Sequence, residues 1–187
     1  MKKKIVYVPM GADIIHRGHL NIIKNARKYG EIIIGLFTDS AIAEYKSLPL
    51  ISYDQRFDII KNISGVKKVV AQETWDYTNN LNKIKPDYVV HGDDWKKGIQ
   101  KKTRDRVIKT LKKWSGKLIE PKYTKNINSK EIRKKILDIL SVPDNRVSIL
   151  KRLINSKDIV RILESHNSLT GLIIENLKVK KKNKSIE

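Results

Sequence analysis

The chain has 187 residues, about the size of one domain, and 40% of them are hydrophobic, which is enough to build a core. No cysteine occurs, which excludes a disulfide scaffold, a thiolate zinc site and a cysteine nucleophile. The amino terminus is basic and then apolar, but its apolar run is too short for a signal peptide. No segment approaches the roughly 18 apolar residues of a membrane span, so we expect a cytoplasmic protein without membrane insertion.

The charge is strongly and unevenly basic, with 40 Lys and Arg against 20 Asp and Glu and a formal net charge of +20. Residues 1–100 hold 16 basic and 11 acidic side chains, whereas residues 101–187 hold 24 and 9. Such a balance indicates polyanionic partners. Only 6% of residues are aromatic, and no aromatic pattern suited to base stacking accompanies the charge, so we do not expect a nucleic-acid partner. We assign most of the surplus to a composition rich in Lys, Ile and Asn and to solvated surface.

Short apolar, β-branched runs alternate with stretches of helical periodicity. The runs predict buried parallel strands over residues 5–8, 32–37, 69–70, 87–90 and 118–119. The periodic stretches predict one helix from residue 20 to a stop at Gly30 and a second from a cap at Asp39 or Ser40 to Tyr45. A third helix is predicted to follow a cap at Ser52, and the residues on its apolar side are Phe57, Ile59, Ile60 and Ile63. A fourth is predicted over residues 103–114. Strands separated by helices imply an α/β fold, a Rossmann-like three-layer parallel sheet with a C-terminal helical extension.

The last third of the chain divides into two parts. Asn128 and Glu131 form a capping-box pattern that opens a helix ending near Leu140. Residues 141–148 contain a proline and small polar residues without periodicity, which is typical of a linker, and helical spacing then continues to Leu177. We therefore expect one complete domain over residues 1–140, followed by a linker and a helical tail over residues 141–187.

The loop after the first strand carries the pattern most specific for chemistry. It reads GADIIHRGH over residues 11–19 and opens the next helix, whose free N–H groups and dipole favour an anion. Gly18 allows a phosphate to approach the backbone closely, and His16 and His19 can each present a ring N–H to the same anion. Two histidines at this spacing could instead bind a metal, although no carboxylate pair stands near them, or each could be an ordinary polar loop residue.

This stretch resembles the HxGH signature of the nucleotidyltransferase superfamily and, more narrowly, of the cytidylyltransferases. The resemblance runs from residue 4 to about residue 137 and includes other motifs in the same order. These motifs are Lys46 after the second strand, SYDQR at residues 52–56, HGDDW at residues 91–95, and YTKNINSKEI at residues 123–132, which resembles the family element RTEGISTTxI.

Some positions depart from the family pattern in that last element. Tyr123 replaces the family's arginine, Asn126 replaces its glycine and Lys130 replaces a threonine. Asn tolerates the left-handed backbone conformation, so the turn can persist. The contact of the missing arginine would have to come from Lys122 or Lys125.

Two further stretches resemble proteins of phosphonate metabolism. Residues 10–13, MGAD, stand where choline- and glycerol-phosphate members read GTFD, and are similar to cytidylyltransferase domains of phosphonate biosynthesis. Residues 152–169 resemble the opening of phosphoenolpyruvate mutase domains, barrel enzymes that form a carbon–phosphorus bond. The chain thus resembles a transferase followed by the start of a mutase-like domain. The alternative is an ordinary helical extension that packs in a dimer.

The resemblance implies transfer of CMP from CTP to a small phosphonate (2-aminoethylphosphonate or 2-hydroxyethylphosphonate) or phosphomonoester, with release of pyrophosphate. It implies Mg²⁺ bound with CTP, a small anionic acceptor, a homodimer, and no metal site built by the protein. The catalytic residues that it implies are His16, His19, Lys46 and Arg56. The nucleotide-binding residues that it implies are Met10, Gly11, Ala12, Asp13, Gly18, Gly92, Asp94, Trp95, Ile127 and Ser129.

Other functions fit parts of the same pattern. A phosphocholine or glycerol-3-phosphate cytidylyltransferase carries the same signature, and so does an adenylyltransferase, although HGDDW and the helix around Arg56 favour cytidylyl transfer. A basic nucleic-acid-binding protein would explain the charge but not the motifs. A degraded, inactive homologue would explain the altered element at residues 123–132.

Overall fold

The computed structural model of the chain describes residues 3–45, 47–96, 98, 100–122, 132, 143–157, 160 and 162–176. Contacts divide the chain into two compact units, Met1–Lys157 and Asp158–Glu187. The first unit is an α/β domain, and the second contains helix α8 (Ser168–Asn176). Within the described ranges, no helix is long and apolar enough to cross a membrane.

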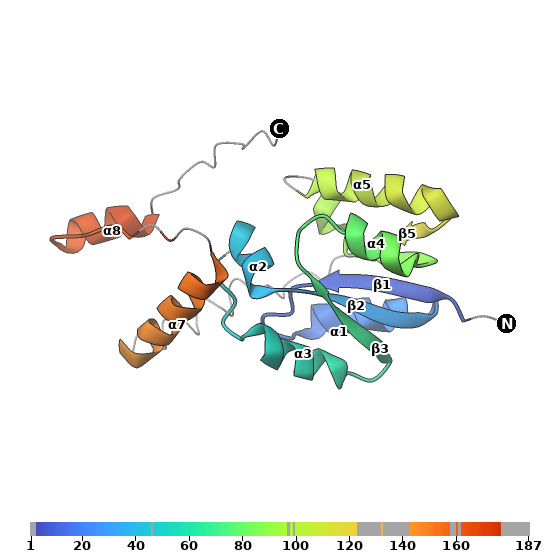
Figure 1. Ribbon diagram of the computed structural model, residues 1–187, viewed down its shortest axis with the longest axis horizontal. Coiled ribbons are helices and arrows are strands. Elements are labelled where there is room, and N and C mark those ends of the chain that lie inside the picture. The colour runs from blue at the N-terminus through green and yellow to red at the C-terminus, as the bar shows by residue number, and fades with distance from the viewer. Residues whose placement is uncertain are drawn as a thin grey trace. The chain divides into compact units, whose positions relative to one another are not determined.

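Five parallel strands form a sheet in the first unit (Figure 1). In chain order they are β1 (Ile5–Met10), β2 (Glu31–Phe37), β3 (Val66–Gln72), β4 (Tyr88–Val90) and β5 (Lys117–Ile119). Their order across the sheet is β3-β2-β1-β4-β5, so β1 lies at the centre. The parallel α/β fold and its five strands confirm the prediction from the sequence.

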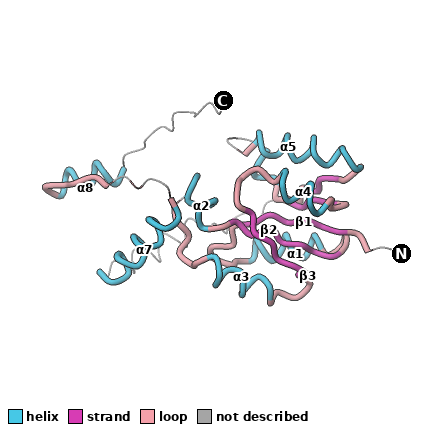
Figure 2. The backbone as a smooth tube through the Cα atoms, in the orientation of Figure 1, coloured by secondary structure: helices cyan, strands magenta, loops and turns pink. Residues whose placement is uncertain are grey.

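Helices cover both faces of the sheet and complete three layers (Figure 2). One face is covered by α1 (Arg17–Ala26) and α3 (Tyr53–Lys61). The other face is covered by α4 (Thr78–Ile84) and α5 (Lys101–Leu111). Each face encloses its own hydrophobic core.

Strand β1 is buried on both faces, which explains its unbroken apolar sequence. Val6 and Val8 pack with Ile23 of α1 and Ile60 of α3 in the first core. Tyr7 points to the opposite face and belongs to the second core, beneath α4 and α5. The central strand therefore joins the two cores.

The order of the strands reverses beside β1. The chain adds β2 and β3 on one side of β1, and then β4 and β5 on the other. In open α/β sheets, ligands bind outside the carboxyl ends of the strands where the order reverses in this way. Residues 11–16 follow β1 and residues 91–95 follow β4, so both motif segments leave the sheet at this point.

The first helix differs from its predicted limits. Helix α1 begins at Arg17, rather than at residue 20, because His16 caps it. Gly30 lies beyond the end of the helix, where its φ is +156° and a Cβ would lie 2.1 Å from Lys4 O. Gly30 thus serves the turn into β2, and its prediction as a helix stop was wrong.

The next two helices differ in detail. The cap of α2 (Asp39–Tyr45) is Thr38, whose Oγ1 accepts a hydrogen bond from Ala41 N at 3.2 Å, so neither residue predicted as the cap fills that role. Helix α3 begins after Ser52, as predicted. Ile59 of α3 is 43% exposed, so its prediction on the buried side was wrong.

Two further helices correct the sequence analysis. Helix α4 was not predicted, because its sequence TNNLNKI has one buried apolar residue, Leu81, and no helical period. Helix α7 (Pro143–Ser156) occupies residues 143–148, where a linker was expected, and its proline stands at the first helical position, where the missing N–H is tolerated. The first compact unit extends to Lys157 instead of ending at residue 140. The helix expected to end near Leu140 lies outside the described residues, apart from residue 132, which is helical.

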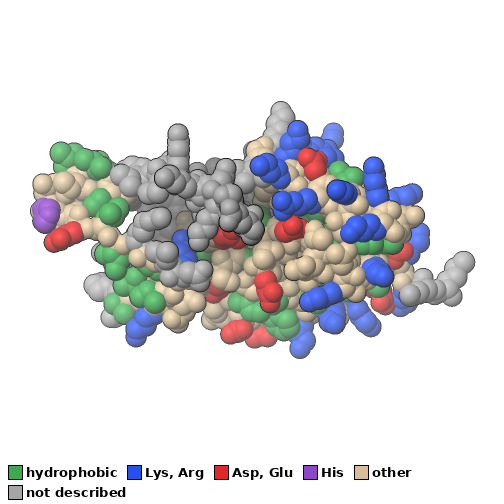
Figure 3. All heavy atoms as spheres, turned by 45° about the horizontal axis from the view of Figure 1, so that its top comes forward, with side chains coloured by type: hydrophobic (Ala, Val, Ile, Leu, Met, Phe, Trp, Pro, Cys, Tyr) green, Lys and Arg blue, Asp and Glu red, His purple; other side chains and the backbone are tan. Residues whose placement is uncertain are grey.

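Lysine and arginine side chains gather along α5 and the short 3₁₀ helix η2 (Lys112–Trp114) that follows it (Figure 3). The apolar side of α5 is buried through Val107 and Leu111. The exposed lysines of the two helices are Lys101, Lys102, Lys109, Lys112 and Lys113.

Gly35 of β2 allows a direct test of the packing between the central strands. A Cβ at Gly35 would lie 1.9 Å from the hydroxyl oxygen of Tyr7, which is wholly buried and donates to Gln72 Oε1 at 2.5 Å. We expect Gly35→Ala to lower the free energy of unfolding by about 1–3 kcal/mol, because the overpacked core must displace the ring. Gly11→Ala is the matched control, since its Cβ would lie 3.7 Å from Ile42, an ordinary contact. Urea unfolding measures both variants, and wild-type stability of Gly35→Ala contradicts this packing.

Candidate active site

The loop between β1 and α1 ends in a histidine that caps the helix. His16 has extended backbone angles, φ −141° and ψ 172°, and its Nδ1 accepts a hydrogen bond from Gly18 N at 3.1 Å. Glycine fits this position because a Cβ on residue 18 would lie 2.8 Å from Cε1 of the same imidazole ring. The absence of a side chain at Gly18 therefore lets a bulky ring serve as the N-cap.

His19 completes a reciprocal cap. Its Nδ1 lies 3.4 Å from His16 N and accepts a hydrogen bond from it. In the usual capping box, a Ser or Thr and a Glu or Gln fill these two positions, whereas here both are imidazoles. The centroids of the two rings are 4.1 Å apart, so the rings are held together at the N-terminus of α1.

This cap defines which ring nitrogens carry protons. Because Nδ1 of each histidine accepts a backbone N–H, the hydrogen bonding assigns the proton of the neutral ring to Nε2. Burial lowers the pKa of His16 below its ordinary value of 6.5, which favours the neutral ring at pH 7. Two Nε2–H donors beside the positive end of a helix dipole suit the oxygens of a phosphate group.

Asp13 joins the loop after β1 to the segment that precedes α3. Its Oδ1 accepts hydrogen bonds from Leu50 N at 2.6 Å and from Ile51 N at 3.2 Å. The carboxylate therefore orients two loops against each other. Its contact with a nucleotide stays a prediction.

Arg56 of α3 contacts the loop after β1, the segment before α3 and the start of α2. Its guanidinium donates from Nε to Ile51 O at 3.1 Å, from Nη1 to Gly11 O at 2.5 Å and from Nη2 to Asp39 Oδ1 at 2.7 Å. The side chain is wholly buried. The phosphate contact predicted for Arg56 is therefore not supported by its placement, and the residue positions the loops instead.

The residues at the carboxyl end of β1 support the loop from within the domain. Met10 and Ala12 are buried, and Gly11 supplies the carbonyl that Arg56 binds. Ala12 has a φ of +51°, a left-handed conformation that costs a non-glycine residue roughly 1–2 kcal/mol. Such strain persists only where the surrounding contacts enforce it.

The segment after β4 forms an aromatic stack. Trp95, in the 3₁₀ helix η1 (Asp93–Lys96), is wholly buried and lies nearly parallel to the ring of His91, with the centroids 3.8 Å apart. His91 Nδ1 lies 2.8 Å from Gly92 O and 3.8 Å from Asp94 Oδ1. Trp95 is thus part of the core, packed against the ring of His91, and its contact with a nucleoside stays a prediction.

Glu120, which follows β5, holds this stack in place and was not predicted as a site residue. Its Oε1 accepts hydrogen bonds from Trp95 Nε1 and from Arg104 Nε, both at 2.8 Å, and its Oε2 accepts one from Arg104 Nη2 at 2.9 Å. The bonds from Arg104 keep the pKa of Glu120 below its ordinary value. The signal that could have found both Glu120 and His91 is their position directly after a predicted strand of a parallel sheet.

Comparison with known proteins then identifies the family. A family model described as cytidylyltransferase-like matches residues 12–135, which include both capping histidines, Arg56 and the segment after β4. The chain belongs to the cytidylyltransferase-like family.

Individual relatives of this cytidylyltransferase-like chain agree with the family model. The chain is 31% identical over 134 residues to an ethanolamine-phosphate cytidylyltransferase of Dictyostelium discoideum. This match covers 70% of this chain and 36% of that protein. It is 33% identical over 98 residues to a glycerol-3-phosphate cytidylyltransferase of Bacillus spizizenii, covering 51% of this chain and 74% of that protein. It is 34% identical over 98 residues to the bifunctional protein HldE of Campylobacter concisus, covering 51% of this chain and 21% of that protein. The chain thus spans well under half the length of the first and third of these relatives.

A solved structure agrees with the fold. The lipopolysaccharide core biosynthesis protein of Thermoplasma volcanium superposes with a TM-score of 0.58 at 20% identity, covering 66% of this chain and 99% of that one. At this level of identity the likeness concerns the fold alone.

Other expected site residues of the cytidylyltransferase-like domain lie outside the described residues. These are Lys46, Ile127 and Ser129, whose roles stay predictions. Among the residues that the structure describes, no three His, Asp or Glu side chains lie close enough together to hold a metal ion.

The cap predicts how His16 titrates. The pKa of His16 in the folded domain should lie below 6.5, because burial disfavours the imidazolium and Nδ1 already accepts a hydrogen bond. Since this folded-state pKa lies below the unfolded value, the capping contribution to stability is complete above pH 6.5 and is lost as the pH falls through the folded-state pKa. An NMR titration of the imidazole resonances measures the value, and a His16 pKa at or above 6.5 contradicts the neutral cap.

Proposed function

We propose that this chain transfers CMP from CTP to a small phosphonate or phosphomonoester and releases pyrophosphate. The observation that carries the proposal is the pair of histidines at the start of α1, whose Nδ1 atoms cap the helix and whose protons lie on Nε2. Membership of the cytidylyltransferase-like family supports nucleotidyl transfer as the reaction class.

The proposed reaction requires the two reactants to be placed in line more than it requires the nucleophile to be activated. An oxygen of the acceptor attacks the α-phosphorus of CTP, and the new P–O bond forms as the bond from the α-phosphorus to the bridging oxygen of the β-phosphate breaks. Pyrophosphate leaves with the electron pair of that bond. The attacking phosphonate or phosphate oxygen is already ionised at neutral pH, so the step needs neither a protein nucleophile nor a strong general base. Mg²⁺ enters with CTP as part of the substrate, since triphosphate oxygens are suitable ligands for it.

The chain's residues would then hold the phosphates and stabilise developing charge. His16 and His19 would donate from Nε2 to oxygens of the α- and β-phosphates, where negative charge grows in the transition state. Lys46 would draw in the α-phosphate or the acceptor, and Ser129 would hold the terminal phosphates. Arg56 acts indirectly, because its guanidinium fixes the carbonyl of residue 11.

The acceptor class is proposed from the relatives and from the sequence. The names of two relatives specify ethanolamine phosphate and glycerol 3-phosphate, both phosphomonoesters. The MGAD segment at residues 10–13 and the mutase-like stretch at residues 152–169 favour a phosphonate such as 2-aminoethylphosphonate. A homodimer that does not bind nucleic acid completes the proposal.

The activity can be tested with a panel of nucleotides and acceptors. CTP, ATP, GTP and UTP are each supplied with Mg²⁺ and with 2-aminoethylphosphonate, 2-hydroxyethylphosphonate, ethanolamine phosphate, phosphocholine or glycerol 3-phosphate. We expect pyrophosphate release with CTP, fastest with a phosphonate. Release with ATP in place of CTP would make the protein an adenylyltransferase, and no release with any pair contradicts the proposed reaction.

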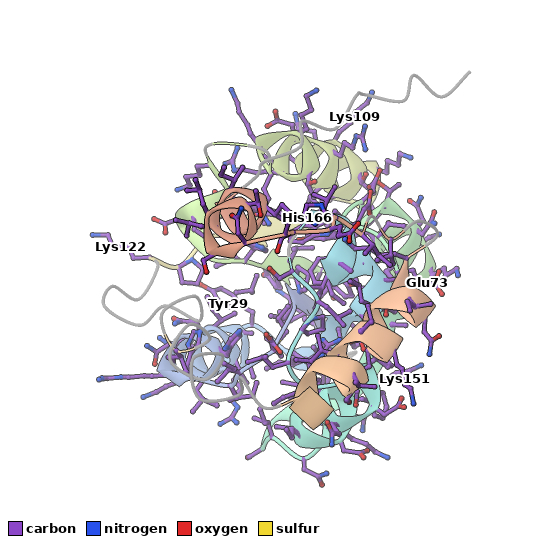
Figure 4. The ribbon with its side chains drawn as sticks, turned by 90° about the vertical axis from the view of Figure 1, so that its left-hand side faces the viewer. Tyr29, Glu73, Lys109, Lys122, Lys151 and His166 are labelled. Carbon is purple, nitrogen blue, oxygen red and sulfur yellow. The ribbon has the colours of Figure 1, made fainter. Side chains whose placement is uncertain are left out.

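Replacement of either capping histidine tests its role. We expect His16→Ala and His19→Ala each to lower kcat by about 10²–10³-fold, the usual loss when one donor to a developing oxyanion is removed. His166→Ala is the control, because His166 is an exposed histidine of the second unit (Figure 4). Steady-state pyrophosphate release is the measurement, and turnover near the wild-type rate in either capping variant removes that histidine from the mechanism.

A further inference from the structure

Helix α7 reaches the candidate site through one side chain. Arg152 donates from Nη1 to Leu50 O at 2.6 Å, and its Nη2 lies 3.4 Å from Asp39 Oδ2. The helix also packs against α2, the helix that Asp39 opens. Because the family model ends at residue 135, this contact comes from a part of the chain that the family match does not cover.

The backbone N–H and carbonyl groups of Leu50 and Ile51 are hydrogen-bonded to charged side chains. Both N–H groups donate to Asp13 Oδ1, at 2.6 and 3.2 Å. The carbonyl of Ile51 accepts from Arg56 and that of Leu50 accepts from Arg152. Four backbone polar groups in two consecutive residues are therefore fixed by three side chains, from the loop after β1, from α3 and from α7, which contributes Arg152.

Two polar routes lead from α7 to the loop after β1. The first passes through the backbone of Leu50 to Asp13. The second passes through Asp39, whose Oδ2 faces the arginine of α7 and whose Oδ1 binds Arg56, and it ends at the carbonyl of Gly11. Both routes end in the segment that leads to the capping histidines.

This arrangement differs from an ordinary surface ion pair. The side chains of Asp39 and Arg152 are 19% and 24% exposed, and that of Arg56 is not exposed at all. Exposed pairs contribute little because water and salt screen them, whereas these groups are mostly shielded. Arg152 Nε is buried without a hydrogen-bond partner among the described residues, so the Nη contacts hold the side chain here despite that unfavourable burial.

We propose that Arg152 is a positioning residue of the transferase site, which holds residues 50 and 51 and, through them and Asp39, the loop that carries His16 and His19. The effect of Arg152 on catalysis rests on the proposed function. Its effect on the position of the loop rests on its contacts with Leu50 and Asp39. Helix α7 ends at Ser156 and the second compact unit begins at Asp158. The helix that supports the site is therefore also the connection to the second unit.

The catalytic consequence is measured with three variants of the full chain. We expect Arg152→Met to lower kcat by about 10- to 100-fold with a smaller effect on KM for CTP, because misplaced donors lose transition-state contacts more than ground-state binding. Arg152→Lys should rescue little of this loss, since one ammonium cannot serve the carbonyl and the carboxylate as the planar guanidinium does. Lys151→Met is the matched control, because Lys151 is the exposed neighbour on the same helix (Figure 4).

The structural consequence is measured by amide hydrogen exchange, which does not depend on catalysis. In Arg152→Met and Arg152→Lys, the amides of Leu50 and Ile51 should exchange at least ~10-fold faster than in the wild type, while the amide of Ile34 in β2 keeps its rate. Unchanged exchange at residues 50 and 51 overturns the proposal, and so does equal acceleration at Ile34, which would indicate general destabilisation. Absence of nucleotidyl transfer in the wild type would refute the proposed function, and the exchange rates would still decide whether Arg152 holds the loop.

Discussion

The guanidinium of Arg56 has no exposed surface, and its nitrogens donate to Gly11 O, Ile51 O and Asp39 Oδ1. A charge removed from water is tolerated only where hydrogen-bond acceptors surround it. That requirement brings three acceptors from three parts of the chain to one place. Arg56 therefore holds together the loop after β1, the segment before α3 and the start of α2. Because the loop after β1 ends in the capping histidines, these hydrogen bonds also fix the position of that loop.

The two imidazole rings at the start of α1 contrast with the formal net charge of +20 of the chain, because burial lowers the pKa of His16 and favours its neutral ring. The backbone of α1 binds Nδ1 of both histidines, so each neutral ring carries its proton on Nε2. The buried guanidinium of Arg56 holds the loops through its hydrogen bonds with Gly11, Ile51 and Asp39. The exposed lysines of α5 lie on a helix that covers the sheet. The net charge of the chain therefore does not determine the chemistry of the candidate site, which depends on how the two imidazole rings are held at the start of α1.

The sequence predicted the parts of the fold that local pattern controls. The unbroken apolar runs of β1 and β2 have one structural explanation, a strand buried on both faces, and both strands are present. The motif at residues 11–19 placed the histidines correctly at a helix start, but not their mutual cap, which depends on the ring orientations. Helix α4 lacks periodicity, and the proline-led start of α7 has the composition of a linker, so the local pattern revealed neither helix.

Tertiary contacts were beyond the reach of local pattern. The resemblance assigned Arg56 to phosphate, whereas its partners are two carbonyls and a carboxylate from other loops. Nothing in the residues around Arg152 indicates that its side chain reaches Leu50, 102 positions earlier in the chain. Glu120 follows a predicted strand, which marks its position, but its hydrogen bond with Trp95 in the stack with His91 is not encoded in the local sequence.

In the proposed reaction, the two imidazoles that are capped through Nδ1 present Nε2–H to the phosphates of a nucleotide. This role is tested most directly by NMR of protein labelled with ¹⁵N in histidine, recorded with and without CTP and Mg²⁺ and without an acceptor. We predict that Nδ1 of His16 and His19 is unprotonated and Nε2 protonated at pH 7.5, and that both Nε2 resonances shift when the nucleotide binds while those of His166 do not. Protonated Nδ1 atoms, or Nε2 resonances that do not respond to bound nucleotide, would contradict it.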